Sequence, residues 1–463
     1  MPEVYDVAVI GAGVVGTAVA RLLTHQQLTV ALLDAGPDVG VGTSKANTAI
    51  LHTGFDATPG SSEARLVRRG YELLNAYAPS VGIAVERTGA VLVAWDDEQA
   101  ANLPAIADKA RANGYVATSL IDAQALYDLE PHLAPGAHAA LLVPDEFIID
   151  PWSTPLAFAR EAIANGATWL PNYLVTKLDR AQDTTLITTA AGHTLRARCV
   201  VNAAGLHSDD IHALLGLSGF TVRPRRGELI VFDKFARPLL TRTILPVPTS
   251  HTKGVLVAPT VFGNIMLGPT ADDIDDKTAT GSTRAGLDAL IEKGGRILPA
   301  LLREEVTAVY AGLRAATEHS DYQISHDVAL GYICLGGIRS TGLTASMALA
   351  EEVLTRLDLC GIKCIPKSND EIMPIRVTNL GETLDRPYQE GFHGSIVCHC
   401  ERVTHDEIVD ACTVAPLATT LDGIRRRTRA LAGRCQGFYC SAEVCALAAQ
   451  TTARPMSDWL GSS

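Results

Sequence analysis

The sequence predicts an α/β protein with a mixed-sheet second domain and a small helical domain at its C-terminal end. Three observations lead to this fold class. A glycine-rich turn joins the first predicted strand to a helix, the same pattern returns over residues 331–357, and eight of the ten cysteines fall in the last 104 residues. A chain of 463 residues is also long enough for about two to four domains.

Composition and charge narrow the classes of partner. Hydrophobic residues make up 47% of the chain, enough for a large core, and the net charge of −12 argues against nucleic acid or an anionic membrane as the main partner. The sequence contains neither a run of about 18 apolar residues nor a basic region followed by an apolar leader. We therefore expect a cytoplasmic protein without a disulfide framework.

The first glycine motif opens a helix directly after the short apolar run Val7–Ile10. Gly11, Gly13 and Gly16 have the spacing G-x-G-x-x-G. In this motif the first glycine permits a tight turn, the second lets backbone approach a pyrophosphate, and the third lets the helix pack on the strand. Asp34, 18 residues after the third glycine, would accept hydrogen bonds from a ribose. A dinucleotide site is favoured over a plain βαβ turn, but the spacing does not distinguish FAD from NAD.

The second glycine segment indicates which of the two cofactors, FAD or NAD, is expected. Gly336–Ser346 follows a strand and starts a helix, whose N-terminus suits the flavin edge that becomes negative on reduction. With Thr43–Asn47 and the turn Asn202–Gly205, it resembles the glutathione-reductase-type FAD fold of the D-amino-acid-oxidase superfamily over residues 5–357. No further glycine fingerprint follows another strand, so nicotinamide is not expected as the direct electron partner.

This resemblance implies which residues surround FAD. The first glycine turn would hold the pyrophosphate, and the last would lie under the isoalloxazine ring. The expected cofactor-binding residues are Gly11, Gly13, Gly16, Asp34, Thr43, Ser44, Asn47, Val175, Ala204, Gly205, Gly312, Gly337, Ile338, Arg339, Thr341, Gly342, Leu343 and Thr344.

The resemblance also implies two domains that alternate along the chain. Apolar/polar alternation with prolines and glycines over residues 222–270 predicts a largely antiparallel sheet in the second of them. The expected FAD-binding segments are about 1–80, 145–220 and 325–358, the substrate-domain segments about 81–144 and 221–324, the linker 359–394 and the C-terminal domain 395–463.

Four of the clustered cysteines follow the spacing C-x-C-x34-C-x4-C. They are Cys398, Cys400, Cys435 and Cys440. Four thiolates satisfy both irons of a [2Fe–2S] centre, and four sulfur ligands also suit zinc, although zinc sites usually pair cysteines as C-x2-C. The segment Val397–Cys440 resembles the bacterioferritin-associated-ferredoxin-like domain, which implies a [2Fe–2S] cluster on these thiolates. Zinc and free thiols are the alternatives.

Two further features of the C-terminal segment lead to predictions about which of its side chains are exposed and which are buried. The run Arg425–Arg429 is interpreted first as a solvated helix face. The alternative is that these arginines offset the charge of the cluster or dock the domain against an acidic partner. Cys412 and Cys445 occupy apolar helical positions and are expected in the core.

A histidine is predicted near the flavin. Thr43–Ala57 reads TSKANTAILHTGFDA and resembles the loop that carries the active-site histidine in glycerol-3-phosphate and L-2-hydroxyglutarate dehydrogenases. On this match His52 would take the hydroxyl proton while hydride leaves for the flavin; the alternative is a histidine hydrogen-bonded at a loop–helix junction. Asp56 stands where glycerol-3-phosphate enzymes carry an arginine. Because an acid cannot hold a phosphate, a hydroxy acid is expected to be the better substrate.

Cations are expected around the substrate anion. Arg314 matches an arginine that lines the pocket in both groups of enzymes and would clamp a carboxylate or phosphate, unless a neighbouring acid ties it down. Arg339, in the second glycine loop, could serve the same anion, and Lys253 lies where a substrate lid would be. Arg225 and Arg226 are expected to brace the sheet instead.

These features predict an FAD-dependent dehydrogenase that oxidises the CH–OH group of a small anionic substrate, either a 2-hydroxy acid or a polyol phosphate such as glycerol 3-phosphate. Electrons would pass singly through the cluster to a quinone-linked or ferredoxin-like acceptor. Amino-acid oxidation is the alternative among enzymes, and use of the C-terminal module as a docking platform is the alternative outside them. A peripheral membrane-associated partner subunit or a homo-oligomer is compatible with this prediction.

Overall fold

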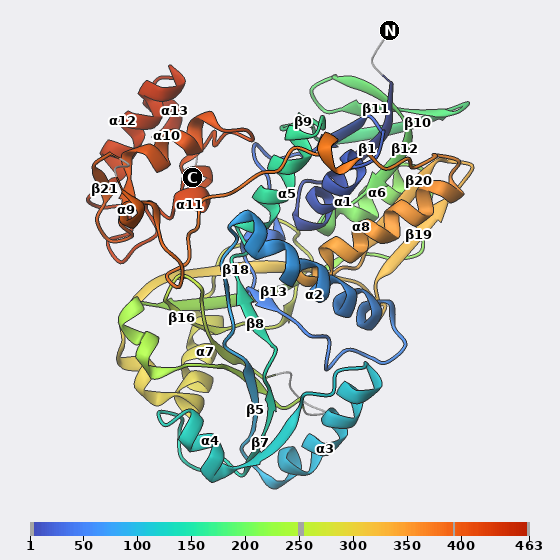
Figure 1. The fold of residues 1–463 in the computed structure, drawn as a ribbon. Helices are drawn as coiled ribbons and strands as arrows, with labels where there is room; N and C mark the ends of the chain where they lie inside the picture. Colours follow the sequence, from blue (N-terminus) through green and yellow to red (C-terminus); the bar gives the residue numbers. More distant parts are fainter. Residues whose placement is uncertain (1–3, 249–253, 392–393, 461–463) are drawn as a thin grey trace.

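The computed structural model describes residues 4–248, 254–391 and 394–460, which form two sheet-based bodies and a smaller helical one (Figure 1). The chain passes repeatedly between the first two bodies. The C-terminal body, red in Figure 1, lies against both of them.

The first body is built on an eight-stranded sheet. Its central strand β1 (Val4–Ile10) pairs in parallel with β2 (Val30–Leu33) and β12 (Thr194–Asn202). The strand before the second glycine loop, β20 (Tyr332–Gly336), pairs in parallel with β12, so both glycine loops leave the same sheet. The other strands are β9 (Thr168–Leu170), β10 (Val175–Ala181), β11 (Thr184–Thr189) and β19 (Gln323–Asp327).

Side chains of β1 alternate between two hydrophobic cores. Val7 and Val9 pack with one core, which includes residues of α1 (Val14–Thr24), α5 (Ser153–Ala164) and α8 (Gly342–Leu359). Ala8 and Ile10 pack on the opposite face with a second core, which includes α6 (Ser208–Ala213). Because both faces are covered, the strand reads as a continuous apolar run in the sequence.

The chain after the histidine-bearing loop enters α2 (Ser62–Val81). The Ser61 hydroxyl caps it by accepting a hydrogen bond from the N–H of Ala64. It packs closely against α8. A Cβ on Gly70 would lie only 2.2 Å from the carbonyl oxygen of Thr344, so this contact leaves no room for a side chain. This contact fixes the segment after the first glycine loop against the helix that follows the second.

The second body is a nine-stranded mixed sheet. The predicted antiparallel pairing over 222–270 is confirmed for β13, β15 and β16, while β14 also pairs in parallel with β5. β18 pairs antiparallel with β13 along its length. The strands are β5 (Ala90–Ala94), β6 (Ser119–Asp122), β7 (Ala139–Val143), β13 (Arg223–Phe232), β14 (Thr243–Pro246), β15 (Leu256–Pro259), β16 (Ile265–Gly268), β17 (Asp272–Asp273) and β18 (Val306–Ala316).

Helices α3 (Asp97–Ala112), α4 (Ala123–Leu129) and α7 (Arg284–Ile297) accompany this sheet. A separate three-stranded sheet contains β3 (Ile50–Leu51), β8 (Phe147–Ile149) and β4 (Val85–Glu86). It holds the histidine-bearing loop, since β3 immediately precedes His52.

The C-terminal body has its own small core. Its elements are β21 (Ile396–Cys398), β22 (Val403–Thr404), α10 (His405–Thr413), α11 (Leu421–Thr428), α12 (Ser441–Thr452) and α13 (Ser457–Leu460). Cys412 and Cys445 are buried there with Trp459, as predicted. Nowhere in the described ranges is a helix long and apolar enough to span a membrane.

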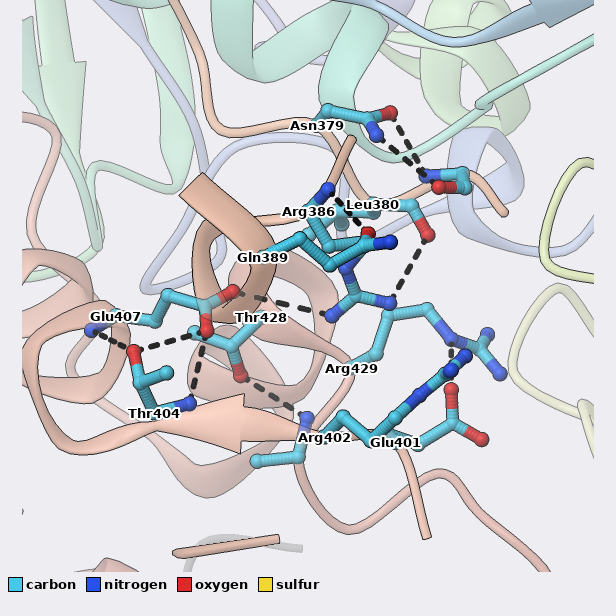
Figure 2. Close-up of polar contacts among 12 residues, drawn as sticks. Asn379, Leu380, Arg386, Gln389, Glu401, Arg402, Thr404, Glu407, Thr428 and Arg429 are labelled. Atoms are coloured by element: carbon cyan, nitrogen blue, oxygen red, sulfur yellow. Dashed lines mark hydrogen bonds and ion pairs between the residues drawn. The ribbon is translucent and has the colours of Figure 1, made fainter. Parts of the chain in front are cut away.

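The segment leading into this body is anchored rather than free. Arg386, only 1% exposed, donates a hydrogen bond to the carbonyl oxygen of Leu380 and lies 3.8 Å from the Glu407 carboxylate (Figure 2). Glu407 in turn caps the start of α10 together with Thr404. The guanidinium therefore joins the linker to the first helix of the domain.

The interpretation of Arg425–Arg429 as a solvated helix face is wrong. Arg426, Arg427 and Arg429 are buried, and only Arg425 is exposed. Arg426 and Arg427 donate hydrogen bonds to Asp38 of the first body, and Arg429 donates to Glu401 (Figure 2). The docking alternative holds, but the acidic partner is this chain's own first body.

Candidate active site and cluster site

The first glycine turn is shaped for a ligand rather than for packing alone. A Cβ on Gly16 would lie 1.8 Å from the Gly11 carbonyl oxygen, so Gly16 is required by the fold itself. Leaving aside its chain neighbours and its own helix backbone, a Cβ on Gly13 would have one heavy atom of the described residues within 4 Å, the Ser44 hydroxyl oxygen at 3.2 Å. That hydroxyl accepts a hydrogen bond from the N–H of Val14, one of the donors that a helix N-terminus offers to a phosphate. The cradle therefore fits a pyrophosphate.

Asp34 holds this turn in place. One carboxylate oxygen accepts from the N–H of Ala12 at 2.6 Å, and the other accepts from the N–H of Gly36 at 2.7 Å. Burial raises the pKa of the Asp34 carboxyl, while these hydrogen bonds act in the opposite direction. Hydrogen bonding of Asp34 to a ribose stays a prediction, because both of its oxygens serve the backbone here.

Three other predicted cofactor residues, Ala204, Gly205 and Val175, lie near the first glycine turn. Ala204 and Gly205 follow β12 beside the first turn, since a Cβ on Gly11 would lie 2.4 Å from the Ala203 carbonyl oxygen. Val175 is buried at the start of β10, in the same core as Ile10. These positions adjoin the turn, and their contact with FAD stays a prediction.

Strand β18 approaches the loop after the first turn very closely. A Cβ on Gly312 would lie 2.1 Å from the carbonyl oxygen of Ala46. The Thr43 hydroxyl donates to the Leu313 carbonyl oxygen at 2.7 Å, and the Tyr310 hydroxyl donates to the Asn47 carbonyl oxygen at 3.2 Å. The predicted residues of 43–47 and Gly312 are thus brought together from the two bodies.

The second glycine loop reaches the histidine. The hydroxyl oxygen of Thr344, in the first turn of α8, accepts a hydrogen bond from the N–H of His52 at 3.0 Å. Gly337 has a φ of +66°, and a Cβ on Gly342 would lie 2.8 Å from the Ile338 side chain. Thr341 donates from its hydroxyl to Glu63 at 2.7 Å, and Leu343 is buried.

His52 is paired with a buried carboxylate that the sequence did not reveal. Its Nδ1 lies 3.0 Å from Oε2 of Glu146, whose side chain is fully buried. The other carboxylate oxygen accepts from the N–H and the hydroxyl of Thr53, at 2.6 and 2.8 Å. Every oxygen of Glu146 is therefore occupied, and the imidazole is held by one nitrogen, which leaves Nε2 available to a substrate.

This pairing sets the electrostatics of the histidine. Burial by itself lowers the pKa of His52, but the Glu146 carboxylate raises it, and the resulting pKa lies above the ordinary value. Asp56, exposed on the following loop, also raises it. Glu146 precedes β8, and only its position before an apolar strand could have drawn attention to it.

Arg314, one of the predicted substrate cations, has no acidic partner in the described structure. Its guanidinium donates to the Thr270 carbonyl oxygen at 3.3 Å, and among the described residues no carboxylate lies within ion-pair distance of it. Its neighbours Arg225 and Arg226 pair with Asp273 and Glu228 and brace the sheet, as expected. Burial lowers the pKa of Arg314, and Arg225 lowers it further, yet an arginine stays charged at neutral pH.

The two remaining predicted cations differ from Arg314. Arg339 donates to the carbonyl oxygens of Ser320 at 2.6 Å and His319 at 3.4 Å, so it holds a loop of the chain. Lys253 lies outside the described residues. Of the predicted substrate cations, Arg314 is therefore the one that the described structure leaves open to an anion.

The four predicted cluster ligands are gathered at one end of the C-terminal body. The thiol of Cys398 lies beside that of Cys440, and the thiol of Cys400 lies beside that of Cys435. Within the described part of the chain, no three ligand-type side chains converge as a single metal ion would require. Four thiolates are the donor set that a two-iron centre needs, and ligation by these four cysteines stays a prediction.

Comparison with known proteins agrees with this two-part construction. A family model described as FAD dependent oxidoreductase matches residues 6–356, and one described as a BFD-like [2Fe-2S] binding domain matches residues 396–450. A glycerol 3-phosphate dehydrogenase of Caloramator mitchellensis is 33% identical over 461 residues, which are 98% of this chain and 96% of that protein. The similarity to that enzyme therefore extends through the C-terminal body.

Two further relatives resemble the oxidoreductase part. Mitochondrial L-2-hydroxyglutarate dehydrogenase of Homo sapiens is 30% identical over 286 residues, which are 58% of this chain and 61% of that protein. The structure of dithionite-reduced L-α-glycerophosphate oxidase of Mycoplasma pneumoniae with FAD bound covers 79% of this chain and 97% of its own, at 29% identity and a TM-score of 0.75. The fold of the first two bodies is thus one that holds FAD.

Proposed function

Because this chain belongs to the FAD-dependent oxidoreductase family and carries a BFD-like [2Fe–2S] domain, we propose that it is a dehydrogenase for a small anionic alcohol, with glycerol 3-phosphate as the first candidate. Its cofactors are FAD and a [2Fe–2S] cluster. The observation that carries the proposal is Arg314, a half-buried guanidinium whose only hydrogen bond in the described structure is to the carbonyl oxygen of Thr270. An anionic substrate group would supply the missing partner.

His52 is the group that we assign to the hydroxyl proton. When bound, FAD supplies the acceptor for the hydride that leaves the substrate carbon. Glu146 fixes the imidazole through Nδ1, so the proton would be taken at Nε2. Glu146 is a positioning residue, since it acts on the substrate only through the histidine.

The full-length relative supports glycerol 3-phosphate as the first candidate, ahead of the hydroxy acid that Asp56 led us to expect from the sequence. That relative is named a glycerol 3-phosphate dehydrogenase and shares both the oxidoreductase part and the C-terminal body. The hydroxyglutarate enzyme of Homo sapiens aligns with only 58% of the chain. Shared organisation over the whole chain weighs more than similarity in one part of it.

A 2-hydroxy acid is the second candidate, and one observation favours it. Asp56 lies four residues after His52, at the position where glycerol-3-phosphate enzymes were expected to carry an arginine. Its charge reaches His52 electrostatically, so a second phosphate charge nearby would be repelled. A carboxylate held by Arg314 alone would avoid part of this cost.

The electron route continues from the flavin to the C-terminal body. A [2Fe–2S] cluster carries one electron at a time, whereas alcohol oxidation releases two. We infer that the cluster passes electrons singly to a quinone or protein acceptor. Its thiolate ligands Cys400 and Cys435 are half-buried, so the cluster edge is close to solvent.

Anaerobic stopped-flow bleaching of the flavin tests the substrate. We expect glycerol 3-phosphate to reduce the flavin of the holoenzyme faster than L-2-hydroxyglutarate does, and both faster than amino acids. Faster reduction by L-2-hydroxyglutarate would establish the second candidate. Reduction by an amino acid alone would reject an alcohol dehydrogenase, and no reduction by any of the three would support the docking-platform hypothesis.

A further inference from the structure

A cavity of about 710 Å³ lies where the three bodies meet. We call it the interdomain cavity; its walls come from residues 45–49, 260–266, 306–311 and 422–436, with Trp152 at the start of α5. His52, Arg314 and Arg339 are absent from the described residues that line it, so it is separate from the candidate substrate site. Its volume lies in the range of small-molecule sites, about 300–1,000 Å³.

One wall of the interdomain cavity is flat and aromatic. The rings of Trp152 and Phe262 are stacked, with centroids 5.2 Å apart and an interplanar angle of 28°. The guanidinium carbon of Arg429 lies 4.2 Å from the Phe262 centroid and 5.6 Å from that of Trp152. Arg429 is itself held by Glu401 at 2.9 Å, so this wall is rigid (Figure 2).

Exposed apolar side chains also line the cavity. Val306 and Val309 of β18 line the cavity and are 52% and 48% exposed. Leu431 and Met266 add further apolar surface. A planar ring bound in this cavity would find both aromatic and aliphatic side chains to pack against.

One cation that lines this cavity has no ion pair among the described residues. Lys45 and Arg426 both contact the Asp422 carboxylate at 3.2 Å, Arg426 also pairs with Asp38 at 2.7 Å, and Arg429 pairs with Glu401 at 2.9 Å. Arg425 is exposed, and in the part of the chain that the structure describes it makes neither an ion pair nor a side-chain hydrogen bond. An anionic group on a ligand would pair with Arg425.

The cavity also lies between the two cofactor regions. The lining includes Asn47, which is itself predicted to contact FAD together with Thr43 and Ser44, and Gln436, which follows the predicted cluster ligand Cys435. A ring bound here would touch both segments.

We propose that the interdomain cavity is a second ligand site, which binds a planar conjugated ring of mononucleotide size carrying one anionic group. The site does not depend on which alcohol the enzyme oxidises. Two kinds of molecule share this chemistry, a flavin mononucleotide and an aromatic quinone with an acidic substituent.

Binding to FAD-saturated holoprotein tests the proposal. FMN and anthraquinone sulfonate serve as probes, riboflavin is the neutral counterpart of FMN, and equilibrium dialysis with a separate measurement of released FAD excludes exchange at the FAD site. We expect at least one anionic probe to bind at one per chain, and the tighter of the two identifies the source. Riboflavin should bind about tenfold more weakly than FMN if FMN is that source.

Three variants localise the site. Arg425→Ala should weaken the bound anionic probe about tenfold, and Val309→Trp should abolish its binding by filling the cavity. Arg284→Ala, which removes an arginine that is 92% exposed on α7, should leave binding unchanged. Absence of binding by both probes overturns the proposal, as does equal binding to wild type and both cavity variants. Retained FAD content and circular dichroism show that each variant is folded.

Discussion

Asp38 and Arg427 form a two-pronged ion pair that joins the C-terminal body to the first body. The two terminal nitrogens of Arg427 donate to the two carboxylate oxygens of Asp38 at 2.6 and 2.7 Å. The Asp38 side chain is fully buried and also accepts from Arg426 at 2.7 Å. Arg426 also donates a hydrogen bond to the Val39 carbonyl oxygen. The next residue, Gly40, donates from its N–H to the carbonyl oxygen of Ala12 in the first glycine turn. The cluster domain thus supports the loop that contacts the FAD cradle.

Arg427→Ala should destabilise the protein by roughly 3–5 kcal/mol, because it leaves a buried carboxylate partly unpaired. FAD retention should fall as well, since the supported loop loses one of its anchors. Urea unfolding and the flavin content after gel filtration measure the two effects. Arg296→Ala, which breaks an exposed pair with Glu292, should cost no more than about 0.5 kcal/mol. Equal stability of the two variants would show that the domains do not depend on this pair.

Two glycines of the first turn should respond differently to the same substitution. Gly13→Ala adds a Cβ that would contact the Ser44 hydroxyl at 3.2 Å and no backbone atom of another described segment, so the protein should fold but lose FAD, whose pyrophosphate needs that space. Gly16→Ala places a Cβ 1.8 Å from the Gly11 carbonyl oxygen and should prevent correct folding. Flavin absorbance and circular dichroism separate the outcomes. A Gly13→Ala protein that keeps stoichiometric FAD would contradict the assigned role of the turn.

The His52–Glu146 pair predicts a pH dependence of flavin reduction. As a base His52 must be neutral, so the rate should rise with pH through a pKa above the ordinary value of about 6.5. In Glu146→Gln the largest raising charge is gone while burial still lowers the pKa of His52, so this rise should move to lower pH. His52→Ala should slow reduction by roughly 10²–10⁴-fold.

Stopped-flow rates across pH check these expectations, with Asp97→Asn as the control for loss of an exposed acid. The control should keep the wild-type profile. An unshifted rise in Glu146→Gln would mean that another group titrates.

The C-terminal cysteines should bind iron rather than zinc. We expect about two irons and two acid-labile sulfides per chain in anaerobically prepared protein. Cys435→Ser should lose the cluster and keep FAD, because Asp38 and the arginines that hold its loop remain in place. Cys364→Ser, at a half-buried linker cysteine, should keep both. One zinc per chain would favour the structural alternative.

The sequence predicts those features whose signals are local. The glycine spacing after Ile10 and the spacing of the cluster cysteines each lie within a short stretch, so fold class and cofactors follow from them. The partners of His52 and Arg427 lie 94 and 389 residues away. No periodicity encodes such contacts, which depend on how strands and domains pack.

The role of the run Arg425–Arg429 also could not be predicted from local sequence. A helix segment with consecutive arginines has the composition of a solvated face, and only the position of Asp38 across the domain boundary makes it an interface. Arg314 is different, because its predicted role required only that nothing neutralise it. Its carboxylate-free surroundings in the described structure agree with that condition.

Arg314→Ala should weaken binding of the anionic substrate by roughly 2–4 kcal/mol while leaving FAD bound, because a half-buried guanidinium loses its anion but makes no predicted cofactor contact. Arg225 is the matched control, since it faces Arg314 in the register of β13 and β18 and already pairs with Asp273. Arg225→Ala should therefore change substrate affinity little. The dependence of flavin reduction on substrate concentration gives the apparent affinity for glycerol 3-phosphate and for L-2-hydroxyglutarate in each variant. If both substrates keep their affinity in Arg314→Ala, the anion is held elsewhere, and Arg339 is the next residue to test.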